Sequence, residues 1–303
     1  MKKLSGCGTA LITPFKQDQS LDEDRLRRLV EWQIESGIHF LVPCGSTGEA
    51  ATLTKAEWLR VIDITIEVAA GRVPIVAGAT SNATAEAVEK AKELGRRKGV
   101  DAILTASPYY NKPTQEGQYQ HFKAIAEAVE KPLVLYNVPG RTAANIEPAT
   151  LGRLAKIPNI IAVKEASGNI SQIAEVFSYV PENFLVFSGD DAVTLPVISL
   201  GGVGIISVAS NEIPAEMAQM TCAALDNDWK KAQAIQRKFV RLMQANFIES
   251  NPMPVKAVLA MMGRIEEVYR LPMVPMKKET RAKLQQVAAE AGLLDRGVSV
   301  SDL

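Results

Sequence analysis

Residues 159–169 read NIIAVKEASGN, a short apolar run followed directly by charged and small polar residues. An uninterrupted apolar run of this length is typical of a parallel strand that is buried on both faces. Lys164 stands at the carboxyl end of the run. Side-chain alternation places it on one face with Ala162 and Ala166, whereas Glu165 points to the other face. The segment therefore predicts a lysine inside a sheet, with small neighbours that leave space beside its amine.

Lys164 is the most informative single residue of the chain. A buried ammonium group must find a counter-charge, reach water or lose its proton, and burial favours loss of the proton. A neutral lysine amine can attack a carbonyl carbon and form a Schiff base. The alternative is a lysine that extends from the strand end into solvent. The segment alone does not decide between the two.

Seven more apolar, β-branched runs of the same kind occur along the chain. They begin at Thr9 (TALIT), His39 (HFLVP), Val73 (VPIVAG), Asp101 (DAILTA), Pro132 (PLVLYNV), Phe184 (FLVFSG) and Val203 (VGIISV). With the run at Ile160, the eight starts fall between residues 9 and 203, seven intervals of about 28 residues each. This is the length of one strand–helix unit in a closed eightfold barrel. The repeat predicts a (β/α)8 TIM barrel, an α/β fold.

The stretches between the runs have helical periodicity and helix-start signals. Helices are expected at residues 22–35 behind Ser20, 55–70 behind Thr54 and 84–97 behind Asn82. An open doubly wound sheet is the competing architecture, but it requires a glycine-rich phosphate turn after the first strand. That position holds TPFKQDQS, and the sequence contains neither GxGxxG nor GxxxxGK[ST]. A nucleotide-binding sheet is therefore disfavoured.

The last quarter of the chain has a different pattern. From about residue 215 the sequence has helical segments without strands, at residues 229–247, 254–262 and 278–292. We predict a catalytic barrel domain over residues 1–228 and a C-terminal helical domain, packed on the barrel, over residues 229–303.

Composition excludes several classes of function. Lys plus Arg and Asp plus Glu both number 34, so no excess of positive charge favours nucleic acid or an anionic membrane. The apolar stretch near the amino terminus is too short for a signal sequence, and no run has the roughly 20 apolar residues of a spanning helix. Three widely spaced cysteines indicate neither a disulfide framework nor a zinc motif, and the two histidines argue against a histidine-rich metal site. We expect a cytoplasmic enzyme that acts on small molecules and binds no metal ion.

Polar residues follow most of the predicted strands. The segments are CGSTGE (44–49), SPYYNKP (107–113), YNVPGRT (136–142), SGDD (188–191) and SVASN (207–211). In a parallel barrel these ends meet at one rim, where the active site lies. Ser46 and Thr47 belong either to a helix cap or to a nest of donors that holds a carboxylate. The adjacent Asp190 and Asp191 are expected to make rim hydrogen bonds rather than to bind a metal.

Two further residues of the rim could act on a substrate that is bound to Lys164. Tyr136 is predicted one strand away from Lys164, where its hydroxyl either satisfies a backbone group or moves protons beside an imine. Arg141 follows a Pro-Gly turn. It is either merely solvated or positioned to hold a substrate carboxylate with its planar fork of donors.

The chain resembles the dihydrodipicolinate synthase and N-acetylneuraminate lyase family of Schiff-base-forming class I aldolases over nearly its whole length. The matching blocks are GTALITPF, GSTGEAATL, SPYYNKPTQEG, YNVPGRT, AVKEASGN, SGDD, GIISVASN and NPMPVK. The resemblance implies that Lys164 forms the imine and that Tyr136 relays protons. It implies a hydroxyl chain of Ser46, Tyr136 and Tyr110, with Tyr110 contributed by a neighbouring subunit. Thr47 would hold the pyruvate carboxylate, and Gly189 and the carbonyl of Ile206 would line the pocket.

Within this family, the Arg-Thr pair after YNVPG is similar to the synthase branch. The resemblance implies condensation of pyruvate with L-aspartate 4-semialdehyde to 4-hydroxy-tetrahydrodipicolinate, in lysine and diaminopimelate biosynthesis, without a metal or organic cofactor. It also implies a homotetramer built from tight dimers, each formed through Tyr109 and Tyr110. Ser46-Thr47 departs from the Thr-Thr of many synthases and is common in lyases, but serine keeps the hydroxyl group.

Rival interpretations follow from the same residues. The first is a related aldolase that acts on a 2-keto-3-deoxy sugar acid, N-acetylneuraminate or hydroxy-oxoglutarate, and Arg141 and Tyr110 argue against it. The second is an inactive relative that senses a keto acid or an amino acid. The third is a purely structural barrel, which leaves the polar strand ends unexplained.

Feedback inhibition by lysine is common in the synthase branch. By resemblance, the residues of that regulatory site are Ala50, Lys55, Trp58, Asn82, Glu86 and Tyr109. Lys55 would repel a second ammonium group, and Trp58 is bulky. We therefore predict weak or absent inhibition by lysine.

Overall fold

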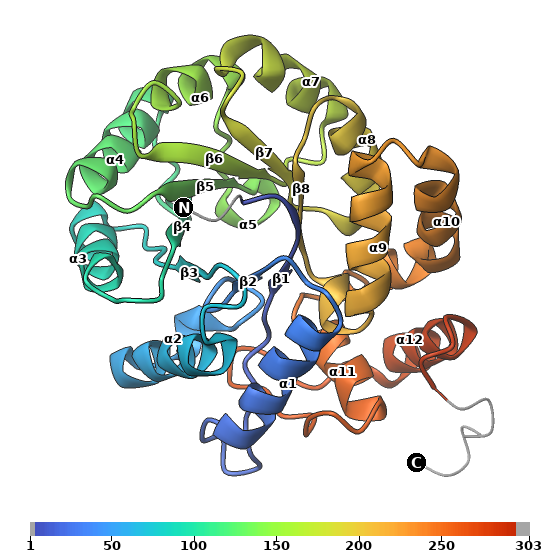
Figure 1. Cartoon of the computed structure of the whole chain (residues 1–303). Coiled ribbons are helices and arrows are strands. Elements are labelled where there is room, and N and C mark those ends of the chain that lie inside the picture. Colours follow the sequence, from blue (N-terminus) through green and yellow to red (C-terminus); the bar gives the residue numbers. More distant parts are fainter. Residues whose placement is uncertain (1–3, 295–303) are drawn as a thin grey trace.

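The computed structural model describes residues 4–294, which form a ring of parallel strands surrounded by helices (Figure 1). The strands are β1 (Gly6–Ala10), β2 (Phe40–Val42), β3 (Val76–Gly78), β4 (Ala102–Ala106), β5 (Leu133–Asn137), β6 (Ile160–Glu165), β7 (Leu185–Ser188) and β8 (Gly204–Ser207). Their order in the sheet is β2-β1-β8-β7-β6-β5-β4-β3. A parallel bridge between Leu41 in β2 and Ile75, directly before β3, joins the two ends of this order and closes the barrel. The predicted (β/α)8 barrel is confirmed.

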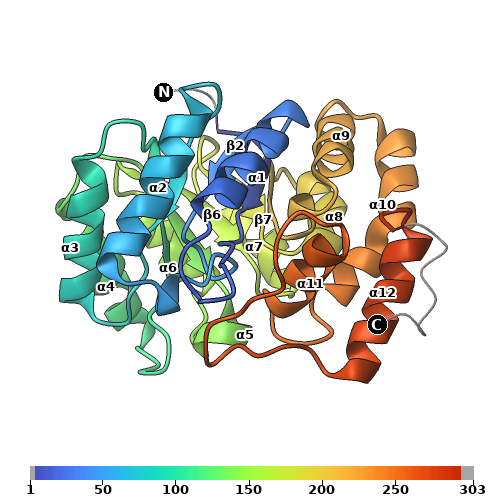
Figure 2. The same cartoon turned by 90° about the horizontal axis from the view of Figure 1, so that it is seen from below.

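The helices lie outside this ring, apart from the short α5. They are α1 (Glu23–Glu35), α2 (Lys55–Ala69), α3 (Thr84–Gly95), α4 (Gln115–Glu127), α5 (Pro139–Thr142), α6 (Pro148–Leu154), α7 (Ile170–Tyr179), α8 (Thr194–Ser199) and α9 (Pro214–Leu225), followed by α10 (Trp229–Ala245), α11 (Met253–Met261) and α12 (Lys278–Glu290). Figure 2 shows α5 at the lower end of the barrel. Short 3-10 turns occupy Ala50–Thr52, Asp191–Val193 and Ala209–Asn211.

Strand alternation divides the core into two layers. Ala162, Val134 and Phe187 face the barrel interior, where the ring of Phe187 packs edge-on against Phe40. Val163 and its equivalents on the other strands face the surrounding helices. The alternation predicted for residues 162–166 is therefore confirmed, and Lys164 lies on the inner side of β6 at its carboxyl end.

The first strand begins at Gly6, three residues before the predicted start at Thr9. Glycine has a low strand propensity, so the sequence pattern does not mark this part. The structure explains the glycines by close packing on the neighbouring strand. A Cβ atom on Gly6 would lie 2.5 Å from the His39 ring, and one on Gly8 would lie 2.1 Å from the ring of Phe40.

Two of the three expected helix caps are wrong. Thr54 forms a full capping box with Glu57 at the start of α2, as predicted. Helix α1 is capped by Asp22, because Ser20 instead bonds to Asp18 within the preceding turn. Helix α3 begins after Ala83 without a side-chain cap. The Asn82 amide donates to the carbonyl of Tyr109 instead.

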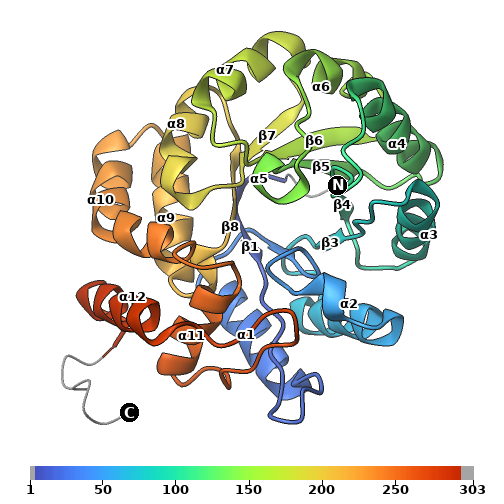
Figure 3. The same cartoon turned by 180° about the vertical axis from the view of Figure 1, so that it is seen from behind.

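The C-terminal helices pack on the barrel beside α1 and α9 (Figure 3). Phe239 and Leu242 of α10 belong to the same apolar cluster as the outer layer of the barrel. Val255 and Leu259 of α11 pack against Leu29 of α1. The domain boundary after residue 228 falls between α9 and α10 and stays a prediction. The outer ends of the two expected domains, residues 1–3 and 295–303, lie outside the described residues.

No helix within residues 4–294 is long and apolar enough to cross a membrane.

Candidate active site

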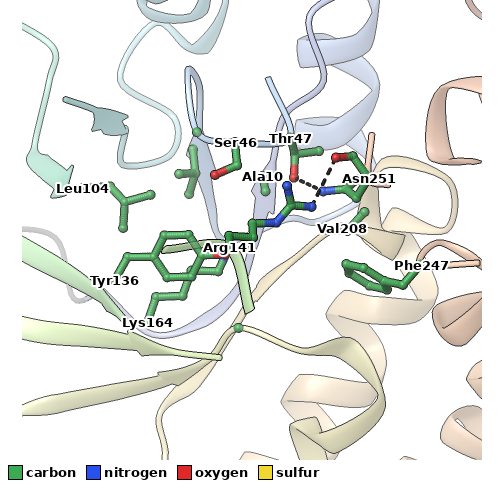
Figure 4. A pocket seen from close by; sticks show the side chains of 13 residues that line it. Ala10, Ser46, Thr47, Leu104, Tyr136, Arg141, Lys164, Val208, Phe247 and Asn251 are labelled. Atoms are coloured by element: carbon green, nitrogen blue, oxygen red, sulfur yellow. Dashed lines mark hydrogen bonds between the residues drawn. The ribbon is translucent and has the colours of Figure 1, made fainter. Parts of the chain in front are cut away.

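A pocket opens at the carboxyl ends of the strands (Figure 4). Its wall combines residues of the barrel rim with two residues that precede α11. The lining residues are Ala10, Val42, Gly45, Ser46, Thr47, Leu104, Tyr136, Arg141, Lys164, Gly189, Val208, Phe247 and Asn251. Six of the eight residues predicted for catalysis and substrate binding are among them.

Lys164 and Tyr136 form one side of this pocket. They are register partners on β6 and β5, and the Nζ atom of Lys164 lies 4.4 Å from the centroid of the Tyr136 ring. Lys164 is only 4% exposed. Burial lowers the pKa of Lys164 to about 8, with the Asp191 carboxylate acting in the opposite direction and Arg141 in the same direction. About a tenth of the amine is therefore neutral and nucleophilic at pH 7, far more than for a solvated lysine.

Tyr136 keeps its proton over the physiological range. Burial raises the pKa of its hydroxyl to about 12. A neutral phenol beside a reacting nitrogen can donate a proton and take one back in a later step. The arrangement thus places a nucleophile and a proton donor side by side.

Gly189 leaves the space that the lysine stem occupies. A Cβ atom at this position would lie 2.8 Å from Cβ of Ala166 and 3.0 Å from Cγ of Lys164. The Gly189 amide also donates to the carbonyl of Glu165, which fixes β7 against β6 at this height. Any larger residue would displace Lys164, so glycine positions the nucleophile here.

Ser46 and Thr47 form the opposite side of the pocket. Their loop follows β2 and turns tightly, with the Gly48 amide bonded to the carbonyl of Gly45. Thr47 is buried, and its Oγ1 accepts a 2.9 Å hydrogen bond from the side-chain amide of Asn251. Because Thr47 accepts in that bond, its own hydroxyl proton is available to a ligand. A carboxylate is the natural acceptor.

Arg141 lies at the mouth of the pocket, at the end of α5. Its Nη2 donates to the main-chain carbonyl of Asn251 at 3.1 Å. Figure 4 shows its guanidinium group beside Thr47 and Asn251. The remaining donors of the guanidinium suit a second carboxylate.

Two predicted site residues are not among the residues that line the pocket in the single chain. Ile206 belongs to the apolar interior of the barrel, and Val208 lines the pocket two residues further on. Tyr110 is 87% exposed and is not one of the lining residues. Within one chain, the structure therefore does not bring Tyr110 together with Ser46 and Tyr136.

The two acidic residues after β7 stabilise the rim. Asp191 is buried and accepts hydrogen bonds from the Ser207 hydroxyl and from the amides of Val208 and Ala209. Asp190 accepts from the amide of Ala192. Residues 4–294 contain no group of three or more His, Cys, Asp or Glu side chains that could hold a metal ion.

Both histidines lie away from the pocket in hydrogen-bonded positions. The Nδ1 atom of His39 accepts from the Cys7 amide, and that of His121 bonds to Thr84.

Only some of the residues proposed for the lysine-binding regulatory site contact one another. Asn82 bonds to the carbonyl of Tyr109, and Glu86 bonds to Ser81 and Lys90. Lys55 is exposed, with its Nζ 3.7 Å from Glu93. Trp58 is buried, and its indole donates to the carbonyl of Gly78. Ala50 lies in the 3-10 turn after the Thr47 loop.

Sequence reasoning missed Phe247 and Asn251 as pocket residues. Asn251 opens the block NPMPVK, which the sequence links to the family but not to the pocket. No local pattern indicates that this segment meets a loop some 200 residues away.

The fold and the pocket define a (β/α)8-barrel enzyme with a buried lysine of lowered pKa at the carboxyl ends of its strands. The sequence matches the Dihydrodipicolinate synthetase family over residues 3–291. It is 73% identical over 292 residues to a 4-hydroxy-tetrahydrodipicolinate synthase of Koribacter versatilis (strain Ellin345), covering 96% of this chain and 97% of the relative. The synthase of the same name from Acidobacterium capsulatum is 61% identical, with the same coverage of both chains.

Solved structures agree with this relationship. The chloride-inhibited dihydrodipicolinate synthase of Acinetobacter baumannii, complexed with pyruvate, superimposes with a TM-score of 0.93 at 42% identity, covering 96% of this chain and 100% of that one. The chain belongs to the dihydrodipicolinate synthetase family.

Proposed function

We propose that this enzyme condenses pyruvate with L-aspartate 4-semialdehyde to give 4-hydroxy-tetrahydrodipicolinate, a step of lysine and diaminopimelate biosynthesis. The observation that carries the proposal is the buried amine of Lys164, whose pKa is lowered to about 8 beside Tyr136. Relatives with 73% and 61% identity are named for this activity, which favours the synthase over the sugar-acid lyases.

In the proposed reaction, the neutral Nζ atom of Lys164 attacks the keto carbon of pyruvate, and loss of water gives an imine. Removal of a methyl proton converts the imine into an enamine, and its carbon attacks the aldehyde of the second substrate. The amino group of the adduct then displaces Lys164 and closes the ring. Tyr136 moves protons at the nitrogen, with Ser46 and a partner-subunit tyrosine at position 110 connecting it to solvent.

The two substrate carboxylates are assigned to different sides of the pocket. The free hydroxyl proton of Thr47 and the amides of its loop would hold the pyruvate carboxylate. Gly189 leaves room for the stem of Lys164 beside the keto carbon, and the carbonyl of Ile206 would line this part of the pocket. Arg141 would hold the carboxylate of aspartate semialdehyde, because a planar guanidinium group matches a carboxylate in two-point contact.

A coupled assay with pyruvate and aspartate semialdehyde tests the proposal. Wild-type protein should turn over this pair and should be inactive after Lys164→Ala. Turnover of a 2-keto-3-deoxy sugar acid, N-acetylneuraminate or hydroxy-oxoglutarate in place of the semialdehyde would favour a lyase. Binding of pyruvate without turnover of any aldehyde would favour a sensor.

The proposal includes a homotetramer of tight dimers in the cytoplasm. Tyr109 and Tyr110 are exposed by 40% and 87% in the single chain, which supports a subunit contact at this loop. Light scattering should give a mass of four chains, and Tyr110→Ser should lower activity. Cys7, Cys44 and Cys222 are free thiols, as expected in a reducing compartment.

A further inference from the structure

The segment from Asn251 to Lys256 contacts the pocket at three points. The side-chain amide of Asn251 donates to Thr47, and its carbonyl accepts from Arg141. At the other end of the segment, the Nζ atom of Lys256 lies 2.6 Å from Oε1 of Glu49, at the end of the Thr47 loop. The segment is thus bonded to the Thr47 loop at two points and to Arg141 at the mouth of the pocket.

The Lys256–Glu49 pair is enclosed. The two side chains are 0% and 2% exposed. Aromatic rings cover the ammonium group, with Nζ 4.5 Å from the centroid of Phe15 and 5.4 Å from that of Tyr269. The second carboxylate oxygen of Glu49 is buried and has no hydrogen-bond partner among the described residues. Lys256 is therefore the direct ionic partner that compensates this carboxylate.

Glu49 is well placed to control the loop. Its backbone has a φ of 52°, in the left-handed region that non-glycine residues rarely adopt. Its amide bonds to the carbonyl of Ser46, and the preceding carbonyl of Gly48 accepts from Thr13. A residue in such a conformation persists only when its surroundings fix it. Movement of Glu49 would therefore move Ser46 and Thr47.

We propose that Lys256 and Glu49 are positioning residues for the carboxylate of the keto acid. They hold the Ser46-Thr47 loop in the position from which its hydrogen-bond donors can bind that carboxylate. In the same position of the keto acid, Lys164 can reach the keto carbon. The inference rests on the proposed function, because it assigns this loop to the first substrate. Neither side chain touches the substrate in this account.

Borohydride trapping over a range of pyruvate concentrations tests the proposal in the full-length protein. The variants are Lys256→Met and the double variant Glu49→Gln/Lys256→Met, which leaves no uncompensated charge if the single variant fails to fold. Both should need about tenfold more pyruvate for half-saturation of Lys164, since a charge-assisted contact of the loop is weakened. At saturating pyruvate, kcat should remain within about threefold of wild type.

Arg241→Met is the matched control, because Arg241 pairs with Glu290 between α10 and α12, away from the pocket. It should leave pyruvate half-saturation unchanged. Half-saturation at wild-type concentrations in the folded variants would overturn the positioning role. So would an equal loss of kcat at unchanged saturation, or failure of both variants to fold, since these results describe a purely structural pair. If wild-type protein itself traps no pyruvate, the proposed function fails instead.

Discussion

The Nζ atom of Lys164 lies over the ring of Tyr136, 4.4 Å from its centroid, because the two residues are register partners on neighbouring strands. The barrel thus fixes the distance between nucleophile and phenol through backbone hydrogen bonds rather than through a flexible loop. Rigid placement of reacting groups lowers the entropic part of an activation barrier.

Tyr136→Phe should remove the proton donor and keep the ring that packs on Lys164. We expect kcat to fall by a factor of about 10² to 10⁴, the usual contribution of general acid–base catalysis. Thermal unfolding should be close to that of wild type, because the phenyl ring still fills the same space. Steady-state kinetics and a melting curve check both parts. A loss of less than threefold in kcat would contradict the assigned role.

The rate of imine formation should rise with pH. The reactive form of Lys164 is the neutral amine, and its pKa is about 8. The value of kcat/KM for pyruvate should therefore increase between pH 6.5 and pH 9 with an apparent pKa near 8.

Asp191→Asn provides a directional control for this profile. The Asp191 carboxylate raises the pKa of Lys164, so its neutralisation should move the rise to lower pH. An unshifted profile in the folded variant would show that another group governs the pH dependence.

Arg141→Met should weaken binding of the second substrate selectively. Loss of a charge-assisted contact to the semialdehyde carboxylate costs about 2 kcal/mol, which corresponds to a rise in KM of about thirtyfold. Pyruvate trapping at Lys164 should stay close to wild type. Arg141→Lys keeps the charge without the planar fork and should restore only part of the affinity. A larger effect on pyruvate than on the semialdehyde would reverse the assignment of the two carboxylates.

Lysine should inhibit weakly or not at all. The exposed ammonium group of Lys55 would repel the ammonium group of an effector at this site. Trp58 is held in the core by its bond to Gly78 and does not offer a polar contact at the surface. Activity with millimolar lysine measures this, and Lys55→Ala should increase sensitivity. Inhibition of wild type at micromolar lysine would show the prediction to be wrong.

Much of the fold was predictable because local sequence patterns determine it. Each barrel strand is a short apolar run at a regular interval, and parallel closure follows from the repeat. The exception, Gly6 at the start of β1, owes its place to the packing of His39, which no local propensity records. The caps of α1 and α3 differ for a similar reason, since Ser20 and Asn82 have closer partners elsewhere.

The site was predictable where its residues sit on strands or directly after them. Alternation and neighbouring strands suffice to bring Lys164 toward Tyr136. The contacts of Asn251 with Thr47 and of Lys256 with Glu49 join residues more than 200 positions apart, and depend on how α11 packs against the rim. No spacing in the sequence encodes such a contact.

Borohydride reduction in the presence of pyruvate, followed by peptide mass spectrometry, tests imine formation at Lys164 most directly. A reduced pyruvyl adduct is expected on Lys164 and on no other lysine, and none is expected after Lys164→Ala. An unmodified Lys164 in active protein, or an adduct on a different lysine, would contradict it.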